Sequence, residues 1–412
     1  MELKKYKLGD IAKITMGQSP ESKFYNTDGN GIPFLQGCRT FTDYYAKIDT
    51  YTLKITKTAL KNDILMSVRA PVGTMNFTPS DVCIGRGLAS IRATFCEHKF
   101  LYYSLLCNYT RFEKQYSGTT FSSISSDELA EFELSLPDIS EQKIIAKVLS
   151  DIDSKIAVNK KINKELDVMA KELYDYWFVQ FDFPGIDDKP YKPYKTSGGK
   201  MIFNPILKRE IPEGWEVKSI NDFCKNYRGV SYDKSDLLNG PEEGVLVLRG
   251  NNIEGNTLVY DENVAYVPLS FVEPEQKINK HDIIMTMSSG SKEHVGKCTM
   301  FQSDSEHTYG AFMTKFTPKP ECPFFAYRSM LSDFFKSKIK YICGGTGINN
   351  LTNQTFDEIL FPFPPKDVLE SFENLLTPIY EKLGKNNDEI LKLTTLRDEL
   401  LPMLMNGQVS VK

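Results

Sequence analysis

The clearest pattern in this chain is a hydrophobic stripe whose positions recur at alternating steps of four and three residues. Its positions are Ile145, Leu149, Ile152, Ile156, Asn159, Asn163, Leu166, Ala170, Leu173 and Trp177. Such steps average about 3.5 residues, which is typical of an α-helix that packs in a coiled coil. Ser140 is a suitable N-cap, and Glu141 lies in the first turn, where the helix dipole favours an acid. The pattern predicts a first long helix over residues 138–181.

A second stripe of the same kind runs near the end of the chain. Its positions are Phe372, Leu376, Ile379, Leu383, Asn386, Ile390, Leu393, Arg397, Leu400 and Leu404. Asp367 takes the N-cap position here. Pro378 and Gly384 are expected to kink or loosen the helix, because Pro lacks a backbone donor and Gly disfavours a helix interior. This stripe predicts a second long helix within residues 365–412.

The two helices belong to a duplicated unit. Gly118-Thr119 and Gly345-Thr346 are 227 residues apart (345 − 118), and the same offset brings Asn159 onto Asn386. Towards the N-terminus the match is looser and the offset falls to 212 residues, which indicates small insertions in the second copy. A repeat this long indicates a duplicated domain with its helix, since solenoid repeats span roughly 20–50 residues.

The segments outside the helices predict two mixed domains and a linker. Residues 1–137 contain short apolar runs between Gly, Pro and Asn clusters, as strands and turns do, and residues 215–364 repeat them. Residues 182–214, rich in Pro, Gly, Lys and Tyr, are the predicted linker. The second domain follows the end of one helix and precedes the start of the other, so the helices should be antiparallel. We predict an α+β fold with two mixed α/β domains, an antiparallel coiled coil and pseudo-two-fold symmetry.

Asn159 and Asn386 are polar positions on otherwise apolar stripes, each near the middle of its helix. In an antiparallel pair they would face one another, and a buried polar residue at such a position lowers stability but fixes the helix register. The alternative is that both are partly solvated at a frayed part of the stripe. We predict that the two side chains approach closely enough for a direct or water-bridged hydrogen bond.

Composition excludes several classes of protein. The net charge of −4 argues against a non-specific nucleic-acid coat, but it allows a specific binder with clustered basic groups. The eight cysteines form no CxxC pair and have no histidine at ligand spacing, so reduced thiols are favoured over zinc or disulfides. The sequence contains neither a signal-peptide pattern nor a membrane-spanning apolar run. We therefore expect a cytoplasmic protein with no metal site and no membrane contact.

Catalytic motifs are missing from the sequence. It has no Asn/Asp-Pro-Pro-aromatic tetrad for methylation of adenine and no HExxH metal motif. The segment from Gly290 to Cys298 is no P-loop, because it has one residue too many and ends in Cys instead of Ser or Thr. Pro137-Asp138 with Glu141 and Lys143 imitates a nuclease carboxylate–lysine set, but these residues lie at a helix start with no intervening strand. An enzyme is therefore the least favoured hypothesis.

Several segments resemble the specificity subunit of type I restriction–modification enzymes. LSLPDISEQKIIAKVLSDIDSKI resembles the segment that closes each half of those subunits. KPYKPYKTSGGKMIFNPILKREIPEGW resembles their central junction, where Gly-Trp opens the second target recognition domain. LKNDILMSVRAPVG and INKHDIIMTMSSGSKEHVG resemble a strand and loop of these domains. The resemblance covers essentially the whole chain, although FPFPPKDVLESFENL in the second copy lacks the Glu-Gln of the first and argues against identical docking by the two helices.

The resemblance implies a function and a set of partners. Each target recognition domain would read half of a split, asymmetric site in double-stranded DNA. The helices would set the unspecified spacer and dock two methyltransferase subunits, and two restriction/translocase subunits would complete a complex that methylates adenine N6 or cleaves unmodified DNA. This chain would bind no cofactor, since S-adenosylmethionine, ATP and Mg belong to the partners. The alternative is the specificity subunit of a related fused restriction–methylation system with a different nuclease partner.

The candidate DNA contacts lie mainly in loops after strand-like runs and in the Gly-Thr segments. Base edges are read mainly by Arg, Lys, Asn and Gln, whereas most other contacts position the DNA backbone. Eight of the ten arginines lie in the two domains, as recognition domains on non-reading helices would require. For each candidate, the alternative is a solvated or locally paired side chain. The predicted contacts are Gln36, Arg39, Arg69, Arg86, Thr119 and Thr120 in the first domain and Arg249, Asn251, Asn252, Lys292, Lys297, Thr346 and Asn349 in the second.

Overall fold

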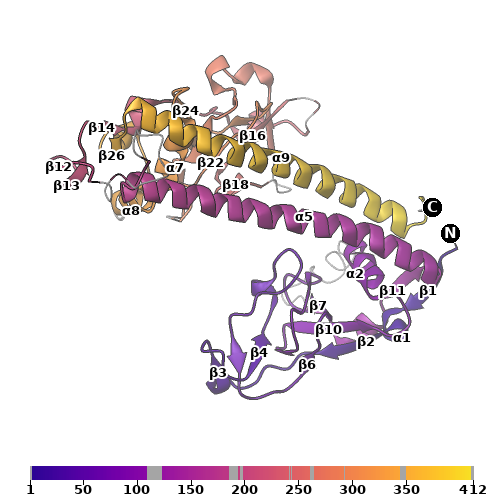
Figure 1. Ribbon diagram of the computed structural model, residues 1–412. Coiled ribbons are helices and arrows are strands. Elements are labelled where there is room, and N and C mark those ends of the chain that lie inside the picture. Colours follow the sequence, from indigo (N-terminus) through magenta and orange to yellow (C-terminus); the bar gives the residue numbers. More distant parts are fainter. Residues whose placement is uncertain are drawn as a thin grey trace. The chain divides into compact units, whose positions relative to one another are not determined.

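The computed structural model describes residues 2–108, 123–184, 194, 198–240, 242, 244–259, 264–291, 293–343 and 349–409 (Figure 1). The chain divides into a first unit, Met1–Lys160 with Asp388–Lys412, and a second unit, Lys161–Asn387. Two long helices, α5 (Ile139–Tyr174) and α9 (Lys366–Met405), each contribute residues to both units. Helices and sheets in two repeated domains confirm the predicted α+β fold.

The first unit is built on an antiparallel sheet of four strands. Its strands, in spatial order, are β2 (Ala12–Met16), β10 (Leu88–Ala93), β7 (Ile64–Ser67) and β8 (Met75–Phe77). A second sheet orders β3 (Tyr25–Asn26), β5 (Tyr51–Thr52), β4 (Ile32–Leu35), β9 (Val82–Ile84) and β6 (Thr58–Ala59). The described part of this unit also contains β1 (Lys4–Lys7), paired with β11 (Glu133–Leu136), and the helices α1 (Leu8–Ile11), α2 (His98–Cys107) and α4 (Ser126–Ala130).

Alternate residues of β7 enter two different cores. Ile64 and Met66 join a core that includes residues of α2 and of both long helices, whereas Leu65 packs with Leu35 and Ile84 of the second sheet. Successive side chains of a strand point to opposite faces, so a strand covered on both faces is apolar throughout. This two-sided burial explains the short apolar run that marks the strand in the sequence.

The second unit repeats this arrangement with longer connections. Its four-stranded sheet orders β15 (Cys224–Arg228), β24 (Met313–Pro318), β20 (Ile283–Thr286) and β22 (Cys298–Met300). A second sheet orders β19 (Ala265–Val267), β16 (Val245–Leu248) and β23 (Thr308–Tyr309). Shorter pairs are β14 (Glu216–Ser219) with β26 (Leu360–Phe363), β17 (Ile253–Glu254) with β18 (Thr257–Leu258) and β21 (Ser288–Ser289) with β25 (Asn349–Asn350). The helices are α6 (Ile220–Phe223), α7 (Pro323–Leu331) and α8 (Asp333–Ile342).

Part of the predicted linker is ordered. β12 (Met201–Asn204) and β13 (Arg209–Pro212) form an antiparallel hairpin within residues 182–214. Trp215, which follows this hairpin, packs on Phe178, Phe181 and Phe183, three residues that come directly after α5 in the chain. The end of the first long helix is therefore held by an aromatic cluster, and its last turn, Asp175–Val179, is a π-helix.

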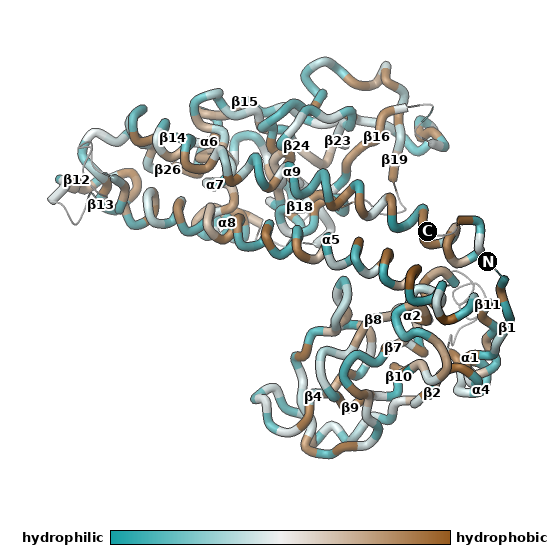
Figure 2. The backbone as a smooth tube through the Cα atoms, turned by 45° about the vertical axis from the view of Figure 1, so that its right-hand side comes forward, coloured by the Kyte–Doolittle hydropathy of each residue, from teal (hydrophilic) through white to brown (hydrophobic). Residues whose placement is uncertain are grey.

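The long helices run antiparallel within each unit. In the first unit, Arg397 Nη1 lies 3.1 Å from Asp153 Oδ1, and Asn159 Nδ2 donates to Glu389 Oε2 at 2.8 Å. In the second unit, Asn386 Nδ2 donates to Asn163 Oδ1 at 2.8 Å. Hydrophobic and hydrophilic positions alternate along both helices, as Figure 2 shows.

Asn159 and Asn386 are both buried, at 2% and 1% exposure. Their recorded hydrogen bonds go to Glu389 and Asn163, respectively, so each finds a polar partner on the other long helix. The frayed alternative is therefore wrong for both positions, because a frayed stripe would leave the amides solvated.

α9 continues as one α-helix through Pro378 and Gly384, so neither residue ends it. A Cβ at Gly384 would lie 2.8 Å from Gln302 Cβ, so the glycine allows the loop after β22 to approach the helix closely. Packing in the second unit thus offsets the low helix propensity of glycine.

Candidate nucleic-acid interface

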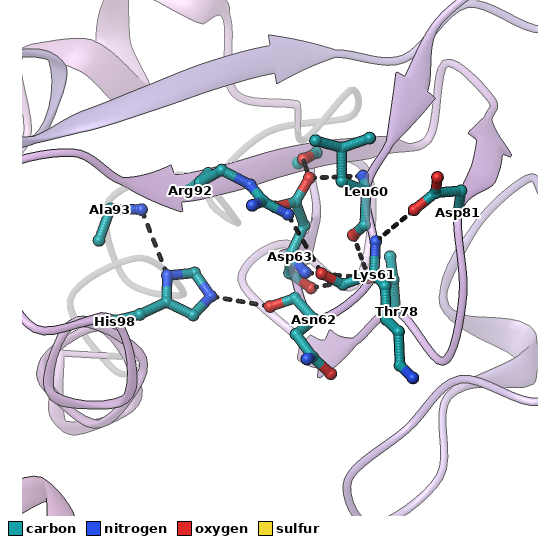
Figure 3. A network of polar contacts seen from close by, with 10 residues as sticks. Leu60, Lys61, Asn62, Asp63, Thr78, Asp81, Arg92, Ala93 and His98 are labelled. Carbon is teal, nitrogen blue, oxygen red and sulfur yellow. Dashed lines mark hydrogen bonds and ion pairs between the residues drawn. The ribbon is translucent and has the colours of Figure 1, made fainter.

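The sheet of the first unit is anchored by a buried aspartate at the start of β7. Asn62 has a left-handed backbone (φ 64°), a conformation that Asn tolerates better than most residues, and it turns the chain into the strand. Asp63 then accepts hydrogen bonds from Ser90 Oγ at 2.7 Å and from Arg92 Nε (Figure 3). The motif that the sequence shows as Asn-Asp before an apolar run is therefore a structural anchor.

His98 of α2 secures the same turn. Ala93 N donates to His98 Nδ1 at 3.2 Å, so the other ring nitrogen, Nε2, donates to the Asn62 carbonyl at 2.8 Å. Figure 3 shows the imidazole between these two backbone groups. The neutral tautomer with the proton on Nε2 satisfies both bonds.

The second unit uses the same anchor with exchanged side chains. His281 has a left-handed backbone (φ 70°), and Asp282 follows it at the start of β20. Asp282 accepts from Thr317 Oγ1 at 2.5 Å and pairs with Lys315 Nζ at 3.1 Å. Each aspartate thus contacts one hydroxyl and one cation. These contacts hold the start of β7 in the first unit and the start of β20 in the second.

Backbone hydrogen bonds bring three loops of the first unit together. They lie where β7 ends and β10 begins, at the far end of these strands from the Asp63 anchor. Gly85 N donates to the Leu35 carbonyl at 2.8 Å, which joins the β9–β10 loop to the loop after β4. Val68 N donates to the Gly87 carbonyl at 2.9 Å, which adds the loop after β7. We call these loops, residues 36–40, 68–74 and 85–87, the first loop cluster.

The first loop cluster presents most of the candidates predicted in this domain. Gln36, Arg39, Arg69 and Arg86 are all exposed. Arg39 Nη2 lies 2.8 Å from Asp49 Oδ2, next to a cavity of about 280 Å³ that Gln36 and Arg39 help to line. A hydrogen bond from Thr50 and the Arg39 guanidinium lower the pKa of Asp49. An exposed pair of this kind contributes little to stability, so Arg39 can exchange it for a phosphate or a base at small cost.

The second unit forms an equivalent cluster. Gly310 N donates to the Leu248 carbonyl at 2.9 Å, and Met287 N donates to the Phe312 carbonyl at 2.9 Å. These bonds join the loop after β16, the β23–β24 loop and the loop after β20. We call residues 249–252, 287–291 with 293–297, and 310–312 the second loop cluster.

One close contact between two glycines occurs at each cluster. A Cβ on Gly17 would clash with the Gly85 carbonyl, and a Cβ on Gly229 would clash with the Gly310 carbonyl in the same way. No other residue type permits so close an approach of two backbones. The glycines therefore allow the loops that carry the candidates to pack closely on a neighbouring backbone in both clusters.

The candidates of the second cluster differ in exposure. Asn251 is exposed, and Arg249 and Lys297 are half-buried. Among the described residues, Arg249 Nε is buried with no hydrogen-bond partner. Lys297 Nζ lies 3.2 Å from His294 Nδ1. Arg249 Nε is therefore an unpaired donor inside the loop, and a ligand could reach it only after the side chain changes position.

Asn252 is a correction to the predicted contacts. Its side chain is 1% exposed, its Oδ1 accepts from Arg249 N at 2.9 Å, and its Nδ2 donates to the Val259 carbonyl at 3.1 Å. The amide is occupied inside the 3₁₀ turn Gly250–Asn252 and shapes the loop that presents Arg249. A polar residue type in a loop could not reveal this burial.

One predicted contact of the Gly-Thr segments, Asn349, lies beside the second loop cluster, because its strand pairs with residues of that cluster. Asn349 lies in β25, which pairs with β21 through Ser289. The predicted contacts Thr119, Thr120, Lys292 and Thr346 lie outside the described residues.

Not every arginine of the two domains is a candidate reader. Arg92 holds Asp63, and Arg328 is 3% exposed with its guanidinium on Asp167 and on the Tyr380 hydroxyl. Conversely, the sequence prediction omits Arg228 and Phe312, two exposed residues of the second unit beside these loops. The repeat contains a signal for them, since Gly229 and Gly310 match Gly17 and Gly85.

Other kinds of site find no support in the described part of the chain. No group of three or more His, Cys, Asp or Glu residues there could hold a metal ion. All eight cysteines, each within the described ranges, are free thiols. Among the described helices, none has the length and apolar character needed to cross a membrane.

Comparison with known proteins identifies relatives over both halves of the chain. A family model described as "Type I restriction modification DNA specificity domain" matches residues 1–168 and 212–389. The type I restriction enzyme MjaIX specificity subunit of Methanocaldococcus jannaschii is 26% identical over 423 residues, covering 98% of this chain and 93% of the relative. The EcoKI specificity subunit of Escherichia coli K12 is 30% identical over 209 residues, covering 49% of this chain and 45% of the relative. The S subunit of a type I restriction–modification system from M. genitalium shares the fold, with a TM-score of 0.60 and 16% identity over 98% of this chain and 96% of that one.

Proposed function

The chain belongs to the type I restriction modification DNA specificity family, and from this premise we propose that its two loop clusters read the two halves of a split, asymmetric DNA site. One observation carries the proposal: the two clusters have equivalent backbone hydrogen bonds but different side chains. Gln36 and Arg86 in the first correspond to Arg249 and Ala311 in the second. Two identical domains would read two identical half-sites, so diverged clusters favour an asymmetric site.

The chemistry of the clusters suits duplex DNA. Arginine can bind guanine O6 and N7 with two hydrogen bonds, and glutamine or asparagine can bind adenine in a similar way. The exposed Arg69, Arg86 and Asn251 are of these types. Because the loops are fixed by backbone bonds, little conformational entropy is lost when DNA orders them. The net charge of −4 leaves recognition to these local groups and not to a general attraction.

The long helices are proposed to set the spacer and to dock the catalytic partners. In the first unit, Ile144, Val158, Leu391 and Leu396 are apolar side chains of α5 and α9 with 43–55% exposure. We propose these exposed side chains as contacts for the catalytic partners. The proposed partners are two methyltransferase subunits and two restriction/translocase subunits. S-adenosylmethionine, ATP and Mg would be bound by those subunits, and this chain would be non-catalytic.

Mapping of modified adenines across the genome tests the function. In a strain with the gene, we expect a split motif with an unspecified gap and different half-sites. Deletion should remove modification at that motif alone, and a plasmid copy should restore it. A continuous palindromic motif, or an unchanged pattern after deletion, would contradict the proposal.

A further inference from the structure

Phe312 is an exposed aromatic residue on a fixed backbone in the second loop cluster. Its exposure is 70%, yet its carbonyl accepts hydrogen bonds from Met287 N at 2.9 Å and from Ser288 N at 3.3 Å. Met313 N also donates to Gly310 O at 2.8 Å, which closes the turn around it. A single exposed apolar side chain needs no explanation by itself. Here, however, the exposed ring belongs to a loop that is held by backbone hydrogen bonds and lies among residues that are candidates for DNA contact.

A cation is hydrogen-bonded to the backbone of the residue that precedes Phe312. Arg228, the last residue of β15, is exposed, and its Nε donates to the carbonyl of Ala311 at 3.4 Å. The guanidinium is thereby anchored one residue from Phe312. An apolar ring with a neighbouring cation presents two chemistries to one ligand: a surface for stacking and a charge for a phosphate.

The first unit lacks the ring at the equivalent position. The Gly87 carbonyl accepts from Val68 N, as the Phe312 carbonyl accepts from Met287 N. A Cβ on Gly87 would lie only 2.6 Å from the Gln36 carbonyl oxygen, so the first cluster has no room for a side chain there. The first cluster instead carries its cation one position earlier, at Arg86. The two clusters therefore differ in the shape of this position as well as in residue identity.

We propose that Phe312 is a wedge that enters the base stack of the half-site read by the second unit, with Arg228 on the phosphate beside the opened step. The inference rests on the proposed DNA-reading function. It adds that the second unit deforms the half-site that it reads. Apolar wedges in other DNA-binding proteins partly unstack a base step and kink the duplex by roughly 20–90°. Pyrimidine–purine steps deform most easily, so this half-site should contain one at the wedge position. The other half-site, facing Gly87, should stay stacked.

The test uses the full chain assembled with its methyltransferase partner, without S-adenosylmethionine. The probe is a duplex carrying the motif from methylome mapping, with 2-aminopurine placed in turn at each position except the methylated adenines. We expect a fluorescence rise at one step in one half-site only. Phe312→Ala should abolish the rise and weaken binding roughly ten-fold or more, the loss typical of one stacked base. Phe312→Trp should retain the rise.

Two further variants separate the wedge from general effects. Phe95→Ala is the matched control: Phe95 is 67% exposed, but it follows the far end of β10, away from the first loop cluster. It should leave fluorescence and affinity unchanged. Arg228→Gln should keep the fluorescence rise, weaken binding at every sequence and lower the slope of log K against log salt by about 1.

The outcomes distinguish the two levels of the proposal. If the unmodified complex shows no sequence-specific binding, the DNA-reading function fails and the wedge fails with it. If it binds specifically but shows no unstacking, or if Phe312→Ala behaves like the unmodified chain, the wedge alone is overturned. A loss of methyltransferase binding by Phe312→Ala in the absence of DNA would also overturn it, because the ring would then contact a protein.

Discussion

Asp63 and Asp282 occupy equivalent positions in the two sheets, and each contacts one hydroxyl and one cation of the neighbouring strand. The two groups occur in opposite order along that strand in the two units. On β10, Ser90 supplies the hydroxyl and Arg92 the cation, and on β24, Lys315 supplies the cation and Thr317 the hydroxyl. Residues two apart on a strand point to the same face, so either order places both groups on the aspartate. The anchor is therefore defined by its chemistry and not by one residue at each position.

The Asp282 anchor should be essential for the stability of the second unit. Lys315 and Asp282 are 3% and 1% exposed, so Lys315→Met leaves a buried carboxylate without its cation. We expect a loss of about 3–5 kcal/mol in the free energy of unfolding. The double variant Lys315→Met with Asp282→Asn should recover much of this loss, as urea unfolding would show. Equal losses in the single and double variants would contradict a charge effect.

Arg92→Met in the first unit is the natural comparison. The Arg92 side chain is 41% exposed, so water can partly solvate the carboxylate that it leaves behind. The loss should therefore be smaller than that of Lys315→Met in the same urea experiment. A larger loss would show that exposure does not decide the cost at this anchor.

Stability of the second unit should fall as pH rises towards 7. Burial raises the pKa of Glu373 from 4.5 to about 7, although its carboxylate accepts the backbone N–H groups of Phe325 and Phe324 at the start of α7. The folded state then binds a proton that the unfolded state has released, so the stabilisation is complete below pH 4.5 and is lost up to about pH 7. The shift corresponds to about 3 kcal/mol. Thermal melts across this range should show the slope, and Glu373→Gln should flatten it.

Glu370→Gln on the same helix is the control for that titration. Its side chain is 56% exposed and pairs with Lys366, so it lacks the burial that perturbs Glu373. The variant should keep the slope of the unmodified chain. A flattened slope in Glu370→Gln would contradict the assignment of the pH dependence to Glu373.

The buried asparagines of the long helices should lower the stability of the helix pair but fix its register. Replacing Asn159 and Asn386 together by leucine should raise the melting temperature, because buried amides stabilise less than apolar packing. It should also broaden the range of spacer lengths accepted in DNA-binding assays, since the polar partners that fix the helix pairing are lost. Lys385→Leu, at an exposed position one residue before Asn386, is the control and should leave the spacer preference unchanged. Lower stability with an unchanged spacer would refute the register role.

The length of the helices should determine the gap between the half-sites. A seven-residue insertion near Asn159, matched by one near Asn386, preserves the hydrophobic period. It lengthens the helices by about 10 Å, which corresponds to roughly three base pairs of DNA. Methylome mapping should find the same half-sites with a longer gap. Matched four-residue insertions, which break the period, should abolish modification, and an unchanged gap with the seven-residue insertions would exclude the helices as the ruler.

The purified chain should neither methylate nor cleave DNA. Its sequence lacks the motifs that either reaction requires, so activity should appear only when a methyltransferase subunit and S-adenosylmethionine are added. A filter assay for methyl transfer and a cleavage assay with Mg and ATP would check this. Turnover by the chain alone, at constant specific activity through purification, would refute it.

The sequence by itself predicted the duplication, the two long helices and the α+β class. These features are linear: a 227-residue offset and a hydrophobic period can be counted along the chain, and periodicity reports which face of a helix is buried. It also indicated the loops that form the two clusters, because strand-like runs end at Leu35 and Leu248, and candidates follow directly.

Only the tertiary structure decided which polar residues face solvent. Arg92 and Arg86 lie six residues apart, yet one neutralises a buried aspartate and the other is exposed in a loop. Asn252 proved to be buried, whereas Phe312 proved to be exposed. The physical reason is that burial depends on segments distant in the chain: the contact of Gly85 with Gly17 and that of Gly310 with Gly229 define these loops. The matching glycines of the repeat mark these positions in the sequence, but which backbones they touch, and which side chains are left exposed, is decided only when the chain is folded.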